Sequence, residues 1–475
     1  MSTSQTDALA VPTTEAATAR WRAVGVVLIG AFMAILDTFI VLVAAPAIQA
    51  DLHTDDAELQ LVVVAYQLAY AVALITGARL GDRYGRKRLF MSGMALFTVS
   101  SVVCAIAPTT VTLIVARLVQ GISAALMFPQ VFAVIQVLLP PTQRHRAFSA
   151  LGAVIGVSTI LGQLVGGLLI AANLFGSGWR PVFWVNVPIG IATLLLAAKL
   201  VPESRLPQGR RLDLPGLAAL TVAMVLLIVP VVQGRQLGWP LWTWLSLAVS
   251  VPAFAVFALV ERRVEAPLVS LRLFRDRSFS VGILLVVVAY AGVNSFFLVL
   301  SLMLQDGLGQ SALGAGLSYA PLAVAFFVTS LLAGKLTPRY GRRVLEAGSV
   351  IAGLGFVVTM ALALTAGPSL TIGLLMPSLV VVGIGNGLLL PQLLNTVLSR
   401  VGPNEVGMAS GVLSTGQQVG GAVGVAVIGV VFFSALGGPG GHVASYGYAL
   451  GVAVGLNVLI AVVATVLLLA LPKAA

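Results

Sequence analysis

Two ionisable side chains lie inside long apolar runs of the sequence, and their types could do proton chemistry. Asp37 is about fifteen residues past Arg22, roughly 22 Å along a helix, and Arg117 is roughly 10 Å from the nearer end of its own run. Burying an ionised Asp in hydrocarbon costs about 2.5 to 3.5 kcal/mol on insertion scales, which favours its protonated form. This predicts that Asp37 carries a proton and that Arg117 modulates it. A purely structural ion pair, or an Arg117 that snorkels to the headgroups, are the alternatives.

Other reactive constellations are missing from the sequence. The histidines His53, His145 and His442 fall in predicted loops far apart, and the single cysteine, Cys104, lies in an apolar run. Neither pattern predicts a metal site or a catalytic base. No Gly-x-x-x-x-Gly-Lys-Ser/Thr phosphate loop occurs, which excludes ATP hydrolysis by that route. We therefore expect no enzyme and no cofactor, with the proton as coupling ion.

The elements that must position Asp37 and Arg117 are membrane-spanning helices. The 475 residues are 59% apolar and only 9% charged, too little polar surface for a water-soluble globule of this size. A bilayer core of about 30 Å needs about twenty apolar residues per helix. An all-α membrane protein is predicted, with fourteen spans near 23–47, 59–79, 89–107, 111–139, 148–172, 181–200, 216–233, 240–260, 280–304, 313–335, 344–365, 370–396, 408–433 and 446–471.

The basic residues orient these spans. Of the 27 Lys and Arg residues, 24 fall at the termini and in every second loop, while Arg180 and Arg235 are the only two in the alternate loops. The positive-inside rule then places both termini in the cytosol. The net charge of +11 reflects this topology and contact with anionic lipid, so no nucleic-acid partner is expected.

Three segments recur in order between the two halves of the chain. R-L-G-D-R-Y-G-R-K at 79–87 matches 335–343, G-I-S-A-A-L-M-F-P-Q at 121–130 matches 383–392, and G-Q-L-V-G-G at 162–167 matches 416–421. Each match joins spans an even number apart, so the repeat is parallel. We predict a cytosolic tail at 1–22, a six-helix bundle at 23–201, an inserted helix pair with its linker at 202–262, and a second six-helix bundle at 263–475.

Several motifs resemble those of the major facilitator superfamily, in its fourteen-span drug:proton antiporter branch. They are L-D-T-F-I-V-L-V-A-A-P at 36–46, G-A-R-L-G-D-R-Y-G-R-K-R at 77–88, R-L-V-Q-G at 117–121 and W-R-P-V-F-W-V-N-V-P-I-G at 179–190. The resemblance implies the major facilitator fold and export of hydrophobic, often cationic, compounds driven by proton entry. Two positions depart from the branch: Gln163 stands where proline is usual, and Leu42 where asparagine is common.

The loop after the second span predicts a cytosolic gate. Gly81 and Gly85 permit a tight reversal there, and Arg83 and Arg86 lie beside Asp82. The resemblance implies that Asp82 contacts a helix N-terminus of the other half; the alternative is that Asp82 only balances its arginine neighbours. The second copy has Pro338 in place of the acid and predicts a second-half gate at Arg339, Gly341 and Arg342.

Small residues and isolated amides suggest where the two halves meet. Glycines let helix backbones approach closely, and they form a predicted packing seam at Gly162, Gly166, Gly167, Gly416, Gly420 and Gly421. Static packing within one half is the alternative for each of them. A substrate cavity between the halves would draw on Tyr66, Gln163, Asn294, Asn386 and Gln417.

Together these patterns predict a proton-coupled exporter of small hydrophobic molecules. Protonation of Asp37 and substrate binding would exclude each other at one shared site as the bundles rock. This mechanism requires the Asp37 carboxyl to reach a water-accessible vestibule. The alternatives are a dedicated exporter of one endogenous metabolite or lipid, and an uncoupled facilitator. We expect a monomer in the lipid bilayer of a bacterial cytoplasmic membrane, because arginine far outnumbers lysine in a composition dominated by Ala, Gly and Val.

Overall fold

Polar residues and glycines at the ends of the apolar runs start and stop the helices. Asp55 caps α2 (Asp56–Tyr84) in a reciprocal capping box with Glu58, with Asp55 Oδ1 2.7 Å from the Glu58 amide. Gly85, at φ +110°, ends α2 and starts α3 (Arg86–Ala105), a backbone conformation that only glycine adopts readily. The predicted sharp reversal is thus confirmed at Gly85, but Gly81 lies inside α2 and takes no part in the turn, so that part of the prediction is wrong.

The computed structural model describes residues 14–205, 213–234, 237–264, 267, 272–398, 406–436 and 442–470, and the regular structure in these ranges is entirely helical. Fourteen helical stretches in them are long and apolar enough to cross a membrane, as predicted. The remaining main helices are α1 (Thr14–Leu52), α4 (Thr110–Leu138), α5 (Pro141–Ala172), α6 (Pro181–Trp184), α7 (Asn186–Leu200), α8 (Leu214–Gly234), α9 (Leu241–Arg263), α10 (Arg277–Leu302), α11 (Ala312–Ser318), α12 (Ala320–Tyr340), α13 (Arg343–Thr365), α14 (Ile372–Leu398), α15 (Val406–Ala435) and α16 (His442–Ala470).

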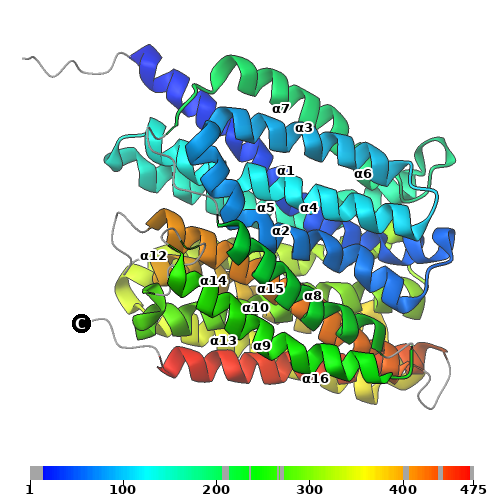
Figure 1. The fold of residues 1–475 in the computed structure, drawn as a ribbon. Helices are drawn as coiled ribbons and strands as arrows, with labels where there is room; N and C mark the ends of the chain where they lie inside the picture. The colour runs from blue at the N-terminus through cyan, green and yellow to red at the C-terminus, as the bar shows by residue number, and fades with distance from the viewer. Residues whose placement is uncertain are drawn as a thin grey trace, which may run out of the picture.

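Helices α1 to α7 form one half of the molecule and α10 to α16 the other (Figure 1). Two helix pairs join the halves most closely: α2 packs against α15, and α5 packs against α11. A π-helical turn, Met303–Gly307, ends α10 at the junction, where Gln305 Nε2 donates to the Val43 carbonyl of α1 at 2.8 Å. We call these two units the N-half and the C-half.

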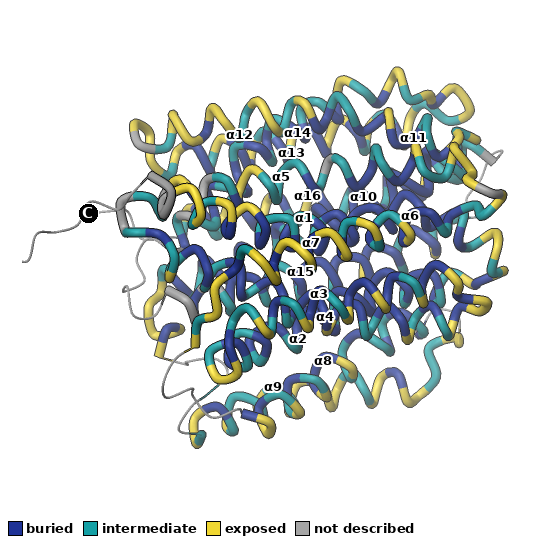
Figure 2. Tube along the Cα trace, turned by 90° about the horizontal axis from the view of Figure 1, so that it is seen from above, coloured by how far each residue is buried: buried dark blue, intermediate teal, exposed yellow. Residues whose placement is uncertain are grey.

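The inserted helices α8 and α9 lie outside the two halves (Figure 2). Helix α8 packs on both α2 and α15, so it covers the line along which the halves meet, with Leu220, Met224 and Ile228 in the shared core. Helix α9 packs mainly on α8 and is largely exposed. Prolines lie inside both helices, at Pro230 and Pro252, without ending either of them.

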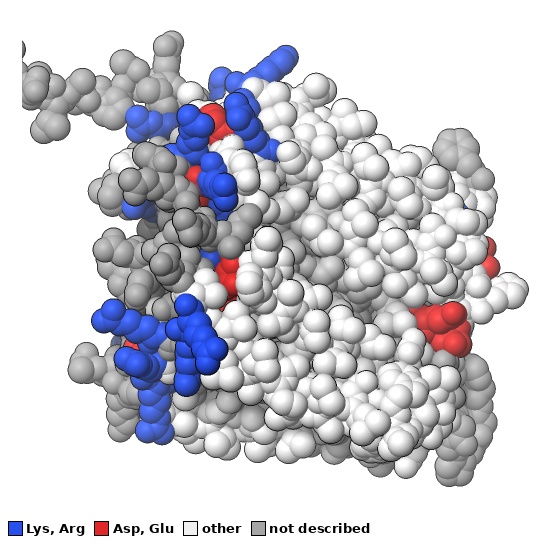
Figure 3. Space-filling view, in the orientation of Figure 1, with Lys and Arg blue, Asp and Glu red and all other residues white. Residues whose placement is uncertain are grey.

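Charge is segregated along the helix axes. Lys and Arg side chains gather at one end of the bundle, on the side where the C-terminus lies, with carboxylates among them, and further carboxylates lie at the opposite end (Figure 3). We call these the basic end and the far end. The basic end contains the α2–α3 turn at Gly85 and the α12–α13 turn at Gly341; the far end contains the α1–α2 turn with Asp51 and Asp55.

The two halves share their packing at the far end. One buried apolar cluster is confined to the basic-end portion of the N-half, whereas the other runs from the far-end portion of the N-half through α8 into the C-half. The face of α5 turned to the C-half shows the same gradient. A methyl group added at Gly152 would meet nothing within 4 Å and at Gly156 would lie 3.4 Å from Phe326, but at Gly167 it would lie 2.4 Å from the Ala312 carbonyl.

Candidate functional site

Asp37 and Arg117 form a buried ion pair inside the N-half. The Arg117 Nη1 group of α4 donates to Oδ2 of Asp37 on α1, and the side chains are 0% and 1% exposed. The sequence placed the two at comparable depth, and the structure brings them together. Arg117 does not snorkel, so that alternative is wrong.

Two amides complete the coordination of the Asp37 carboxylate. Its Oδ1 accepts from Gln120 Nε2 at 3.0 Å and from Asn186 Nδ2 at 2.9 Å, which brings in α4 and α7. Gln120 also accepts from Arg117 at 2.7 Å and donates to Ser101 of α3 at 2.9 Å. Four helices of one half are thus tied to a single carboxylate, directly from α4 and α7 and through Gln120 from α3, and charge-assisted hydrogen bonds of this kind are stronger than neutral ones.

Aromatic rings enclose the guanidinium group. Its central carbon lies 4.3 Å from the ring centre of Tyr66 and 5.7 Å from that of Phe183, distances at which cation–π attraction operates. The Tyr66 hydroxyl donates to the Ala34 carbonyl at 2.9 Å, which fixes α2 against α1. Tyr66 therefore belongs to the charged network and not to a cavity between the halves, contrary to the prediction.

The Asp37 carboxyl faces the interior of the N-half, away from the C-half. Every group that contacts it comes from α4 or α7, whereas Phe39, two residues further along α1, packs edge to face on Phe297 of α10 at 5.6 Å. The carboxyl has no exposed surface, so in this conformation it cannot exchange a proton with water. The prediction of one site shared directly by proton and substrate therefore does not fit this geometry.

At the predicted gate, Asp82 pairs with Arg86 at 2.8 Å, one helical turn away across Gly85. Gly81 packs on the Gln130 side chain of α4, and Arg83 is exposed and lies over the Tyr84 ring at 5.3 Å. The expected contact between Asp82 and a helix N-terminus of the C-half stays a prediction, because residues 399–405, just before α15, lie outside the described residues.

Glu203, an acid that the sequence analysis did not single out, binds the helix end beside this gate. Glu203 follows α7 and accepts hydrogen bonds from the backbone amides of Lys87 and Arg88, at 3.1 and 3.2 Å, in the first turn of α3. A carboxylate at a helix N-terminus also meets the positive end of the helix dipole. Gly85 lies directly under this carboxylate, where an added methyl group would be 2.6 Å from Glu203 Oε1.

The second-half gate has a different charge arrangement. Arg342 pairs with Glu346 at 2.6 Å, while Arg339 is exposed over the Tyr340 ring and Gly341 turns the chain at φ +56°. In the N-half, Asp82 precedes Arg86 by four residues. In the C-half, Glu346 follows Arg342 by four residues. Both gate loops turn at a glycine with positive φ, but the order of acid and arginine is opposite in the two loops.

The predicted glycine seam divides into two faces. Gly162 and Gly166 of α5 pack on α1, against Phe39, Ile40 and Val43, and Gly420 packs on the Val287 carbonyl of α10, so these serve packing within a half. A methyl group added at Gly416 would lie 3.5 Å or more from the side chains of α10, which is ordinary contact within the same half. Gly167 and Gly421 alone among the six touch the other half, at Ala312 of α11 and at Gln67 of α2.

The predicted cavity residues do not form one cluster. Gln163 is buried, and its Nε2 donates to the Phe39 carbonyl at 3.1 Å; Asn294 is buried beside Gly421. Gln417 is half-buried and interacts with Tyr290 of α10, and Asn386 is half-buried on α14. Only Gln163 and Asn294 lie at the junction of the halves.

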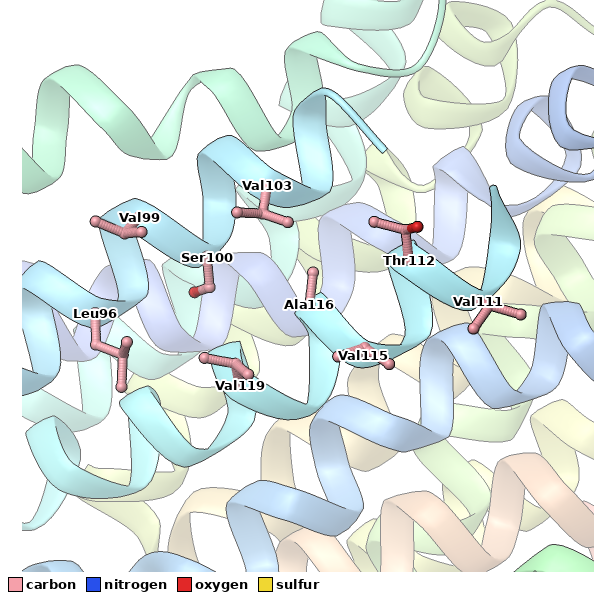
Figure 4. A pocket seen from close by; sticks show the side chains of 9 residues that line it. All are labelled: Leu96, Val99, Ser100, Val103, Val111, Thr112, Val115, Ala116 and Val119. Atoms are coloured by element: carbon pink, nitrogen blue, oxygen red, sulfur yellow. The ribbon is translucent and has the colours of Figure 1, made fainter. Parts of the chain in front are cut away.

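A groove on the outer surface of the N-half lies between α3 and α4 (Figure 4). It contains none of the predicted cavity residues, and its lining is apolar apart from two hydroxyl groups: Leu96, Val99, Ser100, Val103, Val111, Thr112, Val115, Ala116 and Val119. Val99, Val111 and Val115 are each more than half exposed, as expected for a surface covered by lipid.

Gln120, Asn186 and Ser101 are site residues that the sequence analysis did not single out. Gln120 is three residues from Arg117, so both lie on one face of α4, and this spacing of polar residues in an apolar span was a usable signal. Asn186 and Ser101 reach the site from distant parts of the chain. Nothing in the sequence around Asn186 or Ser101 indicated a contact with the Asp37 site.

The helices, their parallel repeat and a charged network buried in one half define a transport protein of the helical, two-bundle kind. Solved structures agree on this fold. A POT family transporter, solved in complex with a thioalcohol-conjugated peptide, superposes with a TM-score of 0.68 at 16% identity, covering 95% of this chain and 97% of that one. A D-xylose–proton symporter does so with a TM-score of 0.66 at 16% identity, covering 93% and 96%.

The chain belongs to the Major Facilitator Superfamily, whose model matches residues 27–425. It is 40% identical to a probable actinorhodin transporter of Streptomyces coelicolor, over 88% of this chain and 73% of the relative. It is 37% identical to a cephamycin export protein of Amycolatopsis lactamdurans, over 87% and 85%, and 34% identical to a puromycin resistance protein of Streptomyces alboniger, over 94% and 91%. It is therefore a multi-pass membrane transporter related to antibiotic exporters.

Proposed function

We propose that this chain exports small hydrophobic compounds in exchange for protons, with Asp37 as the proton-carrying group. The relatives named for export or resistance support efflux as the direction of transport. The segregation of Lys and Arg supports an orientation with the basic end and both termini in the cytosol. On that assignment the far end, where the halves share a core, is the outer side, and this conformation is closed to the outside.

The observation that carries the proposal is the charged network sealed inside the N-half. Ionised groups within membrane spans are expensive and are functional by default. A guanidinium and two amides hold the Asp37 carboxyl group, which has no exposed surface while the network is closed. Proton uptake then requires another conformation, in which α1 or α4 shifts and water enters.

Coupling between proton and substrate is therefore indirect. Helix α1 presents Asp37 to the N-half core and Phe39 to the C-half, so movement of α1 changes both surfaces at once. A protonated Asp37 loses its attraction to Arg117, which loosens α1 from α4 and biases the closure of the halves. Movement of α1 thus couples proton transfer to substrate transport, and the proton and the substrate need no common binding site.

The test is substrate-driven proton release in proteoliposomes. Asp37→Asn alone leaves the Arg117 cation buried without its partner, a loss that costs about 3 to 5 kcal/mol. The double change Asp37→Asn with Arg117→Gln removes both charges, so it should fold. We expect it to bind substrate without releasing protons, and normal proton release from it would exclude Asp37 as the carrier.

A matched control lies on the same helix. Asp51 pairs with Arg180 at 2.8 Å and accepts from Trp179 at 2.9 Å, but it is at the exposed far end. Asp51→Asn with Arg180→Gln removes an acid–arginine pair outside the buried network. It should leave coupling intact, and equal loss of coupling in both double variants would contradict the assignment.

A dedicated exporter of one metabolite is the second candidate function. It is favoured by the relatives named for single compounds, such as the probable actinorhodin transporter and the cephamycin export protein. Resistance of cells that express the chain, measured over a panel of unrelated compounds, separates the two. Protection against a single chemical class favours the dedicated exporter, and export that persists after the pH gradient collapses favours an uncoupled facilitator.

A further inference from the structure

The hydrogen bonds around the Asp37 carboxyl suit only one of its two protonation states. Three side chains contact the carboxyl, and each of them donates to it: Arg117, Gln120 and Asn186. An ionised carboxylate only accepts hydrogen bonds, whereas a protonated carboxyl also carries an O–H group that donates. Because the Asp37 side chain is 0% exposed, that O–H group needs an acceptor within the protein. Proton uptake therefore requires one partner to change from donor to acceptor.

Two of the three partners cannot make this change. The Arg117 guanidinium has donors and no acceptor. The Gln120 amide is held at both ends, because its Oε1 accepts from Arg117 at 2.7 Å and its Nε2 donates to Ser101 at 2.9 Å. A half-turn of this amide would set its NH2 group against the N–H groups of the guanidinium. Asn186 is the partner that remains.

The Asn186 amide is held at one end only. Its Nδ2 donates to Asp37 Oδ1 at 2.9 Å, while its own Oδ1 is buried and has no hydrogen-bond partner among the described residues. The last torsion of an asparagine side chain is broad and roughly two-fold, so a half-turn exchanges oxygen and nitrogen with little other movement. One end of the amide is unpaired before and after the half-turn. The half-turn thus brings an acceptor to the carboxyl and breaks no other hydrogen bond.

We propose that Asn186 is an amide switch, which donates to the ionised Asp37 carboxylate and, after a half-turn, accepts from the protonated carboxyl. The switch rests on the proposed proton-carrying role of Asp37 and adds a positioning residue to it. In the step, a proton from water adds to Asp37 Oδ1. The hydrogen bond from Asn186 Nδ2 breaks, and the new O–H group donates to Asn186 Oδ1. Asn186 gains and loses no proton.

The switch determines which helix keeps its contact with α1 after the proton arrives. Protonation removes the charge attraction between Asp37 and Arg117 of α4, whereas Asn186 keeps a hydrogen bond between α1 and α7 in both states. Helix α1 can then move away from α4 while it stays attached to α7. The movement of α1 that follows protonation is therefore guided by α7.

The test is infrared difference spectroscopy of the protein in nanodiscs, between acidic and alkaline pH, with asparagine isotopically labelled at the side-chain carbonyl. A carbonyl that gains a hydrogen bond absorbs at lower frequency. Acidification of the wild type should therefore shift one labelled carbonyl band to lower frequency. Asn186→Leu should lack the shift, and so should Asp37→Asn with Arg117→Gln. If Asn186 only donated, its oxygen would stay unpaired at both pH values and the band would not move.

Two asparagine variants are matched controls. Asn457 of α16 is fully buried, and neither end of its amide has a partner among the described residues, but it lies beside Gly292 within the C-half. Asn294 is buried at the junction, where separation of the halves would change its contacts. Asn457→Leu and Asn294→Leu should both keep the shift. The proposal is overturned if the wild type shows no shift, if Asn186→Leu keeps it, or if either control loses it.

The same spectra separate the switch from the proposed function. Protonation of Asp37 adds a carboxylic acid band that the Asp37→Asn with Arg117→Gln variant lacks. That acid band without a shift of the asparagine carbonyl would reject the switch and retain Asp37 as the proton carrier. The carbonyl shift in a protein that releases no protons in proteoliposomes would retain the switch and reject coupled export.

Discussion

The N-half and the C-half repeat the same helix arrangement, but only the N-half core contains an ion pair among the described residues. At the 262-residue offset of the second repeated segment, Arg117 corresponds to Leu379, which is fully buried. Beside it, the Ser378 hydroxyl accepts from Thr359 at 2.9 Å, so a neutral hydroxyl pair joins α13 to α14. The difference teaches that the two copies of the repeat share helix packing, while the buried ion pair belongs to one copy.

The glycine motif, unlike the ion pair, makes equivalent contacts in the two halves. The repeated G-Q-x-V-G-G segments place Gly166 against α1 and Gly420 against α10, which are equivalent helices of their halves. The following residues, Gly167 and Gly421, turn to the opposite half. The same motif therefore does the same two jobs in both copies, and differences between the halves lie in the polar residues around it.

The largest expected effect comes from removing the N-half cation. Arg117→Leu copies the C-half residue into the N-half and leaves Asp37 buried without its partner, which should lower the free energy of unfolding by about 3 to 5 kcal/mol. Leu379→Met, which nearly conserves volume, should cost less than about 1.5 kcal/mol. Thermal unfolding in detergent measures both, and equal losses would contradict the contrast between the cores.

The next effect distinguishes the two faces of the glycine motif. A methyl group at Gly167 would lie 2.4 Å from the Ala312 carbonyl of the other half, and one at Gly420 would lie 2.3 Å from the Val287 carbonyl of its own half. Overpacking costs about 1 to 3 kcal/mol in either place. Gly167→Ala should therefore weaken closure at the far end, whereas Gly420→Ala should lower stability without changing closure.

Closure can be followed by maleimide labelling of a cysteine introduced at Ala312, after Cys104, which is buried, is replaced by serine. Faster labelling in Gly167→Ala than in Gly420→Ala is the expected result. Equal labelling in the two variants would mean that Gly167 does not control the junction.

A smaller effect compares the hydroxyl groups of the two cores. Ser101→Ala removes the bond from Gln120, and Thr359→Ala removes the bond to Ser378; each should cost about 0.5 to 1.5 kcal/mol of stability. Only Ser101 belongs to the charged network, so only its replacement should alter the pH dependence of export. A pH profile changed in both variants, or in neither, would contradict the confinement of coupling to the N-half.

The smallest effect on stability concerns the gates. Asp82→Asn and Glu346→Gln each remove one ion pair between residues four apart on partly exposed helix ends, worth about 0.3 to 0.5 kcal/mol. We expect Asp82→Asn to slow export while Glu346→Gln leaves it close to wild type, because Asp82 is the predicted gate acid and the second-half loop has Pro338 at the corresponding position. Unchanged export in both would mean that Asp82 only balances Arg86.

Much of the fold could be predicted from the sequence, because lipid imposes a length and a polarity on every span. The fourteen apolar runs correspond to fourteen membrane-length helical stretches among the described residues, and the parallel repeat was readable from three matching segments. Part of the site was also readable: an acid and an arginine at similar depth have few other partners in hydrocarbon. The sequence could not indicate Asn186 or Ser101, since their distance from Asp37 along the chain says nothing of how α3 and α7 are arranged around α1.

By itself, then, the sequence determined which segments span the membrane, how charge divides between their ends, and which two charged side chains must find one another. Tertiary structure decided which way each residue faces. Asp37 and Phe39 lie two residues apart, yet one faces the N-half core and the other the C-half. In a uniformly apolar span the helix has no amphipathic pattern to set its rotation, so only packing against neighbouring helices determines which side chains meet the other half.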